Sequence, residues 1–367
     1  MSILIVSNGH GEDTIAMNLI HAIQKKNPHT AIMACPLVGE GTAYSNNQIK
    51  PILKNPTFPS GGFIRSIKDL IIDIKAGLIN HIRSQIKTIK AIQDNTITIA
   101  VGDVFCLWLA SFNKTPTFFL PTAKSDHFMP HSMIERYLIR KLAKHSFPRD
   151  KQTADSFIQH KLPASFFGNP MMDSLHTTKK IIENPNNLPI IGLLPGSRKE
   201  GYANLNYMIQ LCEQCHKNNP QTIFACALPH TLDIQIIVQE TQWAYDPQSK
   251  YLTSPNNSCH IYITPHFKEL INQATCIIGL AGTANEQALH LGKTVICFEG
   301  FGPQSSLKRF KEQQQLMGNK LIICHHKIPK EILKILTLEI KKTTIISPSS
   351  SNINASKKII DYMLKAV

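Results

Sequence analysis

Long apolar runs are missing from this chain of 367 residues. No stretch reaches the roughly 18 consecutive apolar residues that a membrane-spanning helix needs, so the sequence predicts none. The start, Met1–Ser7, lacks the basic residues and the long apolar segment of a secretory signal peptide, and we therefore predict that the protein is not exported. The fingerprint Gly-x-Gly-x-x-Gly is absent after the first expected strand, which argues against a nicotinamide-dependent enzyme.

Acidic residues are comparatively few. The 25 aspartates and glutamates face 39 lysines and arginines, which leaves a formal net charge of +14. This charge favours an anionic partner, and nucleic acid, a phosphorylated substrate and an anionic membrane surface all fit it. Nucleic acid is the weakest of the three, because no aromatic side chains are interleaved with the lysines and no nucleic-acid-binding module is recognisable. Ordinary solvated surface also explains part of the lysine excess.

The 9 cysteines, an odd number, lie mostly in apolar runs, as Cys226, Cys276 and Cys297 do. Buried free thiols in a reducing compartment have this pattern, and we therefore expect a cytoplasmic protein. The run Cys212–His216 matches the haem-attachment pattern. However, it falls in an amphipathic helical stretch, haem attachment needs export, and no second cysteine pair stands at zinc-ligand spacing. We therefore predict neither haem, nor metal, nor any other cofactor.

Short β-rich runs alternate with helical patterns along the chain. Ile3–Val6 is typical of a strand, and Glu12–Lys25 then carries apolar residues at helical spacing. This alternation predicts an α/β protein built on doubly wound parallel sheets. The other expected strands are Thr30–Ala34, Thr96–Val101, Thr117–Leu120, Ala164–Phe167, Ile190–Leu194, Thr222–Ala227, His260–Ile263, Cys276–Gly279 and Thr294–Phe298, and the clearest other helices are Glu135–Lys144, Tyr202–Lys217, Phe267–Ala274, Ala284–Leu291 and Ala355–Ala366.

The length fits two α/β domains of ordinary size. Residues 177–188 contain Asn-Pro-Asn-Asn and are typical of an interdomain linker. We therefore expect an N-terminal Rossmann-like domain over residues 1–176 and a C-terminal one over residues 189–350, facing an interdomain cleft. The closing helix, within residues 351–367, could pack back on the first domain. Because such sheets bind ligands at the carboxyl ends of their strands, functional residues should follow strands.

A run of small, polar and ionisable residues, Ser7–Asp13, follows the first strand. Its glycines allow a tight turn, and the helix behind it favours an anion or a polarised hydroxyl. His10 can act as a general base near neutral pH, and Glu12 or Asp13 can orient it or bind sugar hydroxyls. The alternative is an ordinary turn in which Asp13 only caps the helix. The predicted functional loop around His10 consists of Asn8, Gly9, Gly11, Glu12 and Asp13.

Asp103 follows the expected strand Thr96–Val101. A carboxylate at the carboxyl end of a strand could accept a proton from an attacking hydroxyl, which makes Asp103 a second candidate base. The alternative is that Asp103 caps the helix beginning near Phe105.

Two loops of the C-terminal half combine small residues with groups that suit a diphosphate. In Leu194–Arg198 the hydroxyl and backbone donors suit a phosphate, and the arginine can neutralise a diphosphate leaving group. Gly279–Gln287 passes from a strand through a small-residue turn into a helix, whose free N–H groups point at a pyrophosphate. The predicted binding residues are Gly196, Ser197, Arg198, Gly282 and Thr283, with Glu286 or its neighbour Gln287 near a ribose and Gln304 near the sugar.

Residues 61–92 carry isoleucines at helical spacing, and their lysines and arginines outnumber their aspartates. Such a basic amphipathic element could lie on anionic lipid. A helix that packs on the core and exposes a solvated face explains the same stripe equally well.

Six motifs occur in a specific order and spacing: Ser7–Asp13, Val101–Asp103, Gly168–Asp173, Leu194–Arg198, Gly282–Gln287 and Gly300–Gln304. With them the chain resembles, over essentially its whole length, the lipid-A-disaccharide synthase-related proteins of the GT-B superfamily. The resemblance implies a GT-B fold and metal-independent, inverting transfer. A glucosamine-type sugar would pass from a UDP-sugar to a lipid-linked or phosphorylated acceptor, with release of UDP.

The resemblance also implies roles for the candidate residues. The diphosphate would rest on Gly282 and Thr283 with Arg198, the loop Ser7–Asp13 would lie on the acceptor side, and His10 or Asp103 would take the acceptor's proton. Such an enzyme would act at the inner face of the cytoplasmic membrane. Two other functions stay open: a UDP-sugar epimerase of the same fold, which needs no acceptor, and a non-catalytic protein that binds a sugar nucleotide at the membrane.

Overall fold

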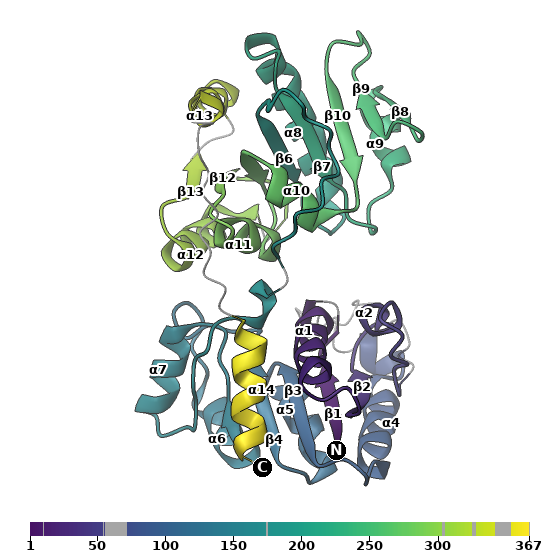
Figure 1. Cartoon of the computed structure of the whole chain (residues 1–367), viewed down its shortest axis with the longest axis vertical. Coiled ribbons are helices and arrows are strands. Elements are labelled where there is room, and N and C mark those ends of the chain that lie inside the picture. Colours follow the sequence, from purple (N-terminus) through teal and green to yellow (C-terminus); the bar gives the residue numbers. More distant parts are fainter. Residues whose placement is uncertain are drawn as a thin grey trace. The chain divides into compact units, whose positions relative to one another are not determined.

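The computed structural model describes residues 1–9, 11–53, 55, 72–173, 175–302, 305–324, 328–341 and 354–366. The chain separates into two compact units (Figure 1). The first comprises Met1–Asp173 and Asn352–Val367, and the second comprises Ser174–Ser351. The polar residues 177–188 are thereby grouped with the second unit.

Over the described residues, the sheet of the first unit has five parallel strands in the order β2-β1-β3-β4-β5. At its centre, Ile5 pairs with Ala34 on one side and with Ile99 on the other. The strands are β1 (Ser2–Ser7), β2 (Ala31–Pro36), β3 (Ile97–Gly102), β4 (Thr117–Pro121) and β5 (His145–Ser146). The helices are α1 (Gly11–Lys26), α2 (Thr42–Ser45), α4 (Leu78–Ala91), α5 (Val104–Ala110), α6 (Met133–Leu142), α7 (Lys151–Gln159) and α14 (Ala355–Ala366), with 3-10 turns at Ser111–Asn113 and Pro170–Met172.

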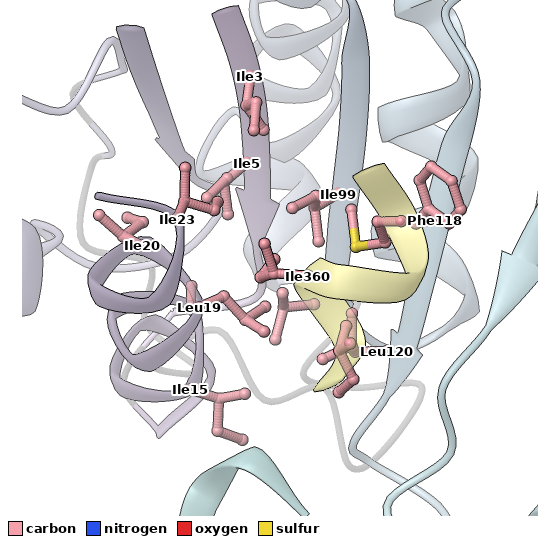
Figure 2. Packing of buried hydrophobic residues seen from close by; sticks show 14 of the residues in the cluster. Ile3, Ile5, Ile15, Leu19, Ile20, Ile23, Ile99, Phe118, Leu120 and Ile360 are labelled. Carbon is pink, nitrogen blue, oxygen red and sulfur yellow. The ribbon is translucent and has the colours of Figure 1, made fainter. Parts of the chain in front are cut away.

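Alternate side chains of this sheet pack on its two faces. Ile3 and Ile5 join the cluster that α1 and α14 cover, as Figure 2 shows. Leu4 and Val6, which point the other way, join a second cluster with residues of α5, α6 and α7. A parallel sheet with crossover helices is buried on both faces, and this explains why its strands are continuous apolar runs in the sequence.

The last helix, α14, belongs to the first unit, and its Ile360 lies in the cluster with Ile99 (Figure 2). Asp173 fixes the start of this helix, because its carboxylate accepts the backbone N–H groups of Ala355 at 2.9 Å and Ser356 at 2.6 Å. Asp173 ends the motif Gly168–Asp173, so this part of the sequence pattern supports the fold.

In the described part of the second unit, the strands follow the order β13-β12-β11-β6-β7-β10-β9-β8. The strands from β13 to β10 are parallel, and β9 and β8 add an antiparallel hairpin. The sheet winds in opposite directions from β6, which lies between β11 and β7. The strands are β6 (Ile190–Leu194), β7 (Ile223–Ala227), β8 (Ala244–Asp246), β9 (Tyr251–Thr253), β10 (His260–Thr264), β11 (Cys276–Gly279), β12 (Thr294–Phe298) and β13 (Leu321–Cys324), and the helices are α8 (Glu200–Asn218), α9 (Ile234–Thr241), α10 (Phe267–Gln273), α11 (Thr283–His290), α12 (Leu307–Met317) and α13 (Pro329–Lys341).

The doubly wound α/β fold predicted from the sequence is confirmed. The nine cysteines are free and buried, as their apolar surroundings predicted. The expected strand Ala164–Phe167 is wrong, because only Ala164 pairs, in an isolated bridge to Ser146. Among the described residues, no helix combines the length and the apolarity needed to cross a membrane.

The basic stripe of residues 61–92 is described only from residue 72 onward, and residues 61–71 lie outside the described part. Gly77, with φ of 99°, interrupts the expected continuous helix just before α4. Within α4, Ile89 is buried and both Ile82 and Ile86 pack against the same core cluster. Over α4, the structure therefore favours the core-packed alternative over a helix lying on lipid.

Candidate functional site

The second unit contains a cavity of about 500 Å³ at the carboxyl ends of its parallel strands. The loops that line it follow β6, β7, β10, β11 and β12. The strands β6 and β11 are neighbours on either side of the point where the winding reverses. Open α/β sheets bind ligands at such switch points, and the volume is in the range of small-molecule sites.

The loop after β6 brings Gly196, Ser197 and Arg198 to the cavity. Gly196 has φ of 97°, which lets the chain turn sharply after the strand. Thr231 holds the far side of the turn, because its hydroxyl donates to the carbonyl of Ser197 at 2.6 Å. Helix α8 begins at Glu200 without a side-chain cap. The loop therefore presents an arginine and a helix N-terminus at one wall.

The loop after β11 brings Gly282 and Thr283 to the same cavity. Its turn is fixed from behind by the buried Asn285, whose amide donates to the carbonyl of Gly279 at 3.0 Å. Helix α11 starts at Thr283 with no side-chain cap. Among the described residues, the backbone N–H groups of Thr283 and Ala284 have no acceptor, so they are available to an anion in the cavity.

A third loop, after β12, is tied to the first two by buried side chains. Asn204 of α8 donates to the carbonyl of Pro195 at 3.0 Å and accepts the N–H of Phe301 at 2.8 Å. Ser305 donates to the carbonyl of Leu280 at 2.9 Å. These bonds hold the walls in place before any ligand binds. The predicted sugar-binding Gln304 lies outside the described residues.

Arg309 of α12 is a second cation of the cavity that the sequence did not reveal. Its guanidinium lies 3.8 Å from the carboxylate of Glu286 and 3.2 Å from that of Glu312. Its Nε is buried and has no hydrogen-bond partner. Glu286 itself is buried and does not line the cavity, whereas its neighbour Gln287 does. Arg309 therefore retains a donor that a ligand could use.

Another part of the lining is largely apolar. Leu228 and Pro229 follow β7, and Pro265 and Phe267 follow β10. A wall of this kind suits a flat ring, while the loops after β6 and β11 suit a diphosphate. The lining of the cavity thus combines charged loops with an apolar part.

In the first unit, the predicted loop Ser7–Asp13 is held by buried hydrogen bonds. The hydroxyl of Ser7 donates to the carboxylate of Asp13 at 2.6 Å and lies 2.7 Å from the hydroxyl of Tyr44. Burial, and then the charge of Asp13, raise the pKa of Tyr44 well above its usual value. Asp13 therefore supports the fold of this loop.

The remaining residues of that loop differ in what the structure shows. Gly9 is buried, Gly11 starts α1 at the surface, and the carboxylate of Glu12 accepts the hydroxyl of Thr122 at 3.2 Å. Asn8 is half-buried beside Gly102, where it would contact any added Cβ. His10 lies outside the described residues.

Asp103 caps α5, because its carboxylate accepts the backbone N–H of Cys106 at 2.9 Å. This is the structural alternative that the sequence left open. A cap and a catalytic base are not exclusive, and the role of Asp103 as a base stays a prediction.

No protein-family model matches the sequence, and no curated protein matches it. Solved structures match over the whole chain. The UDP-GlcNAc 2-epimerase of Neisseria meningitidis, bound to UDP-GlcNAc, has a TM-score of 0.62 at 15% identity, with 100% of both chains covered. The UDP-GlcNAc 2-epimerase of Methanocaldococcus jannaschii has a TM-score of 0.64 at 12% identity, with the same coverage. MurG of Acinetobacter baumannii has a TM-score of 0.56 at 12% identity, with 99% of each chain covered.

These comparisons contradict the expected function and confirm the expected fold. The expected function was transfer of a sugar by a lipid-A-disaccharide synthase-like enzyme. The comparisons contradict it, because UDP-GlcNAc 2-epimerases match the fold better than the glycosyltransferase MurG does. Membership of the lipid-A-disaccharide synthase family is likewise not shown. At such low identity the likeness shows the fold alone: the chain has the Rossmann-like GT-B fold predicted from its sequence.

Proposed function

We propose that the chain is an enzyme that binds a UDP-sugar in the cavity of the second unit and inverts a centre of its sugar, as a UDP-GlcNAc 2-epimerase does. The observation that carries this proposal is the cavity at the β6–β11 switch point, where Arg198 and the uncapped start of α11 line one space. The bound UDP-GlcNAc of the Neisseria meningitidis enzyme supports the same ligand class.

The charged part of the lining would hold the diphosphate. Arg198 supplies a forked, permanently charged donor, and the N–H groups of Thr283 and Ala284 supply neutral donors at the positive end of α11. Arg309 would turn its free Nε toward the same anion. The apolar wall at Leu228 and Phe267 would then take the uracil ring.

C2 of an acetamido sugar is not next to a carbonyl, so a base can remove its proton only as the neighbouring C1–O bond breaks and UDP leaves with that electron pair. UDP must then add back to C1 while an acid returns a proton to the other face of C2. Among the described residues that line the cavity, Glu200 is the carboxylate. It stands two positions after Arg198, at the first turn of α8. We propose Glu200 as one partner in this proton transfer, and the roles of His10 and Asp103 as bases stay predictions from the sequence.

The test is isothermal titration of the purified chain with UDP and UDP-GlcNAc. Arg198→Ala should weaken UDP binding by about tenfold to a hundredfold, and Arg309→Met by about threefold to tenfold because two carboxylates already share its charge. Lys217→Ala, at the exposed far end of α8, and Lys308→Ala, exposed on α12, remove the same charge away from the cavity and should leave the affinity unchanged.

Proton NMR of UDP-GlcNAc with catalytic amounts of enzyme then follows the anomeric signal of the C2 epimer. Conversion that is lost in Glu200→Gln would support the proposed chemistry. Binding without any conversion by the wild-type chain would leave a sugar-nucleotide-binding protein and overturn the epimerase. Folded protein that binds neither nucleotide would overturn the whole proposal.

A further inference from the structure

Helix α6 of the first unit exposes large apolar side chains. Met133 is 86% exposed, Ile134 74% and Tyr137 57%, which makes them the three most exposed large hydrophobic residues in the described part of the chain. Met129, in the loop just before the helix, is 52% exposed. Scattered exposed apolar residues are ordinary, but a cluster on one short helix marks an interaction surface.

The exposed residues of α6 share one side of the helix. At about 100° per residue, the positions fall within about 120° of one another, and they include two exposed basic residues. We call this set the α6 face: Met133, Ile134, Tyr137, Arg140 and Lys141. The opposite side packs inward through the buried Ile139 and the partly buried Leu138 and Leu142.

The helix that carries this face is firmly held. Ser132 and Glu135 form a reciprocal capping box at its start. The two carboxylate oxygens of Glu135 also accept from the ammonium of Lys124, at 2.7 and 2.9 Å, and Arg136 donates to Asp126 at 3.0 Å. The apolar side chains are therefore presented by an anchored helix, and their exposure does not come from a loose end.

We propose that the α6 face docks on a membrane surface rich in anionic lipid. Its apolar side chains would enter the headgroup boundary, and Arg140 and Lys141 would meet the phosphates. Charge complementarity supports this occupant: the one acidic residue of α6, Glu135, is already paired with Lys124, and the chain carries a net charge of +14.

A second copy of the chain fits this face less well. A symmetric contact would set Arg140 and Lys141 close to their own copies, and like charges repel. Three apolar side chains also fall short of the roughly 800 Å² per partner that a stable interface buries. The proposal places a lipid-binding surface on α6, apart from residues 61–92, for which lipid binding was one of two alternatives, and it does not depend on the proposed sugar-nucleotide chemistry.

The test is co-sedimentation of the full chain with vesicles of phosphatidylcholine alone and of phosphatidylcholine mixed equally with phosphatidylglycerol. We expect binding to the anionic vesicles, and at least about a tenfold loss of that binding in Met133→Ser/Ile134→Ser. The control is Ile158→Ser/Leu338→Ser, which removes side chains of 55% and 51% exposure from α7 and α13 and should bind like the wild type.

A second variant separates charge from apolar contact. Lys141→Gln should bind anionic vesicles several-fold more weakly at low salt, and the difference should disappear at high salt. Circular dichroism and the urea unfolding transition of each variant show that the whole chain is folded. Unchanged vesicle binding in the folded double variant would overturn the proposal, as would a concentration-dependent dimer that the double variant abolishes while vesicles bind neither protein.

Discussion

Two glycines occupy the same place in the two units, the first turn after a central strand, yet their surroundings differ. Gly9 follows β1 with φ of 106°, and Gly196 follows β6 with φ of 97°. A Cβ added at Gly9 would lie 2.4 Å from the carbonyl oxygen of Val38, whereas at Gly196 the nearest atom would be 3.7 Å away. The sequence marks both turns alike, but one is packed shut and the other opens on the cavity.

The polar side chains around the two turns repeat this contrast. In the first unit, the hydroxyl of Ser7 and the carboxylate of Asp13 bond to each other, and Asp103 bonds to its own helix. In the second unit, Asn204 and Ser305 brace the loops from behind and leave Arg198 and the start of α11 at the cavity. A strand-end loop becomes a binding site when other residues satisfy its internal hydrogen bonds.

The largest expected effect is on stability, and it tests the contrast between the turns at Gly9 and Gly196. Gly9→Ala should lower the free energy of unfolding by about 3 kcal/mol or more, because the methyl group meets backbone in a left-handed conformation. Gly196→Ala should cost only the conformational part, about 1–2 kcal/mol. Urea unfolding measures both.

Gly11→Ala is the matched control for these variants. A Cβ at Gly11 meets no atom within 4 Å, and its φ is not in the left-handed region. Its stability should stay within about 0.5 kcal/mol of the wild type. Equal losses at Gly9 and Gly196 would contradict the view that one turn is closed and the other open.

Most strands of both cores could be predicted from the sequence because they are largely apolar runs, and Ile190–Leu194 is observed as predicted. The sequence prediction missed β13 and the two-residue β5. The strands β8 (Ala244–Asp246) and β9 (Tyr251–Thr253) could not, since they have three residues each and pair only with each other and the sheet edge. The strand expected at Ala164–Phe167 has the right residues but no neighbour beyond one bridge.

The candidate site was predictable where a residue closely follows a strand. Arg198 and Thr283 each lie within four residues of a strand end, and both line the cavity. Arg309 lies three residues into a polar helix, so only tertiary packing brings it there. Asn204 braces Phe301 across 97 residues of sequence, and a single sequence has no local pattern for such a bond. Loops also look alike whether their polar groups bond internally or face a ligand, which is why Asp13 resembled a site residue.

The next largest effect concerns Lys293, a buried residue at the amino end of β12 in the second unit. Buried Lys293 donates to the carbonyls of Asn272 at 2.8 Å and Ala274 at 2.7 Å, at the end of α10. Burial lowers its pKa from 10.5 to about 8. Between these pH values the unfolded chain binds more protons than the folded one, so this group makes the protein more stable as the pH rises.

We therefore expect wild type to gain up to about 1.4 kcal/mol in unfolding free energy relative to Lys293→Met for each pH unit within that window. The comparison with the variant cancels the contribution of the cysteines except Cys276, because burial raises the pKa of the thiols in both proteins and, among the described thiols, only that of Cys276 interacts with Lys293. Denaturant unfolding at several pH values measures the difference. A difference that stays flat, or that falls as the pH rises, would show that burial does not lower the pKa of Lys293, because the hydrogen bonds to the two carbonyls offset it.

The smallest expected effect concerns Asp103, which caps α5 and is also a candidate base. Asp103→Ala should cost about 1 kcal/mol, the usual value for a lost helix cap, whereas Asp103→Ser keeps an oxygen for the N–H of Cys106 and should cost only a few tenths. If the residue is only a cap, conversion of UDP-GlcNAc should follow stability and survive in the serine variant. If Asp103 is also a base, both variants should lose conversion alike while only the alanine variant loses stability, because a hydroxyl can cap a helix but cannot take the proton. Measuring unfolding and turnover on the same two proteins therefore decides whether Asp103, at a strand end of the first unit, serves only to stabilise the fold.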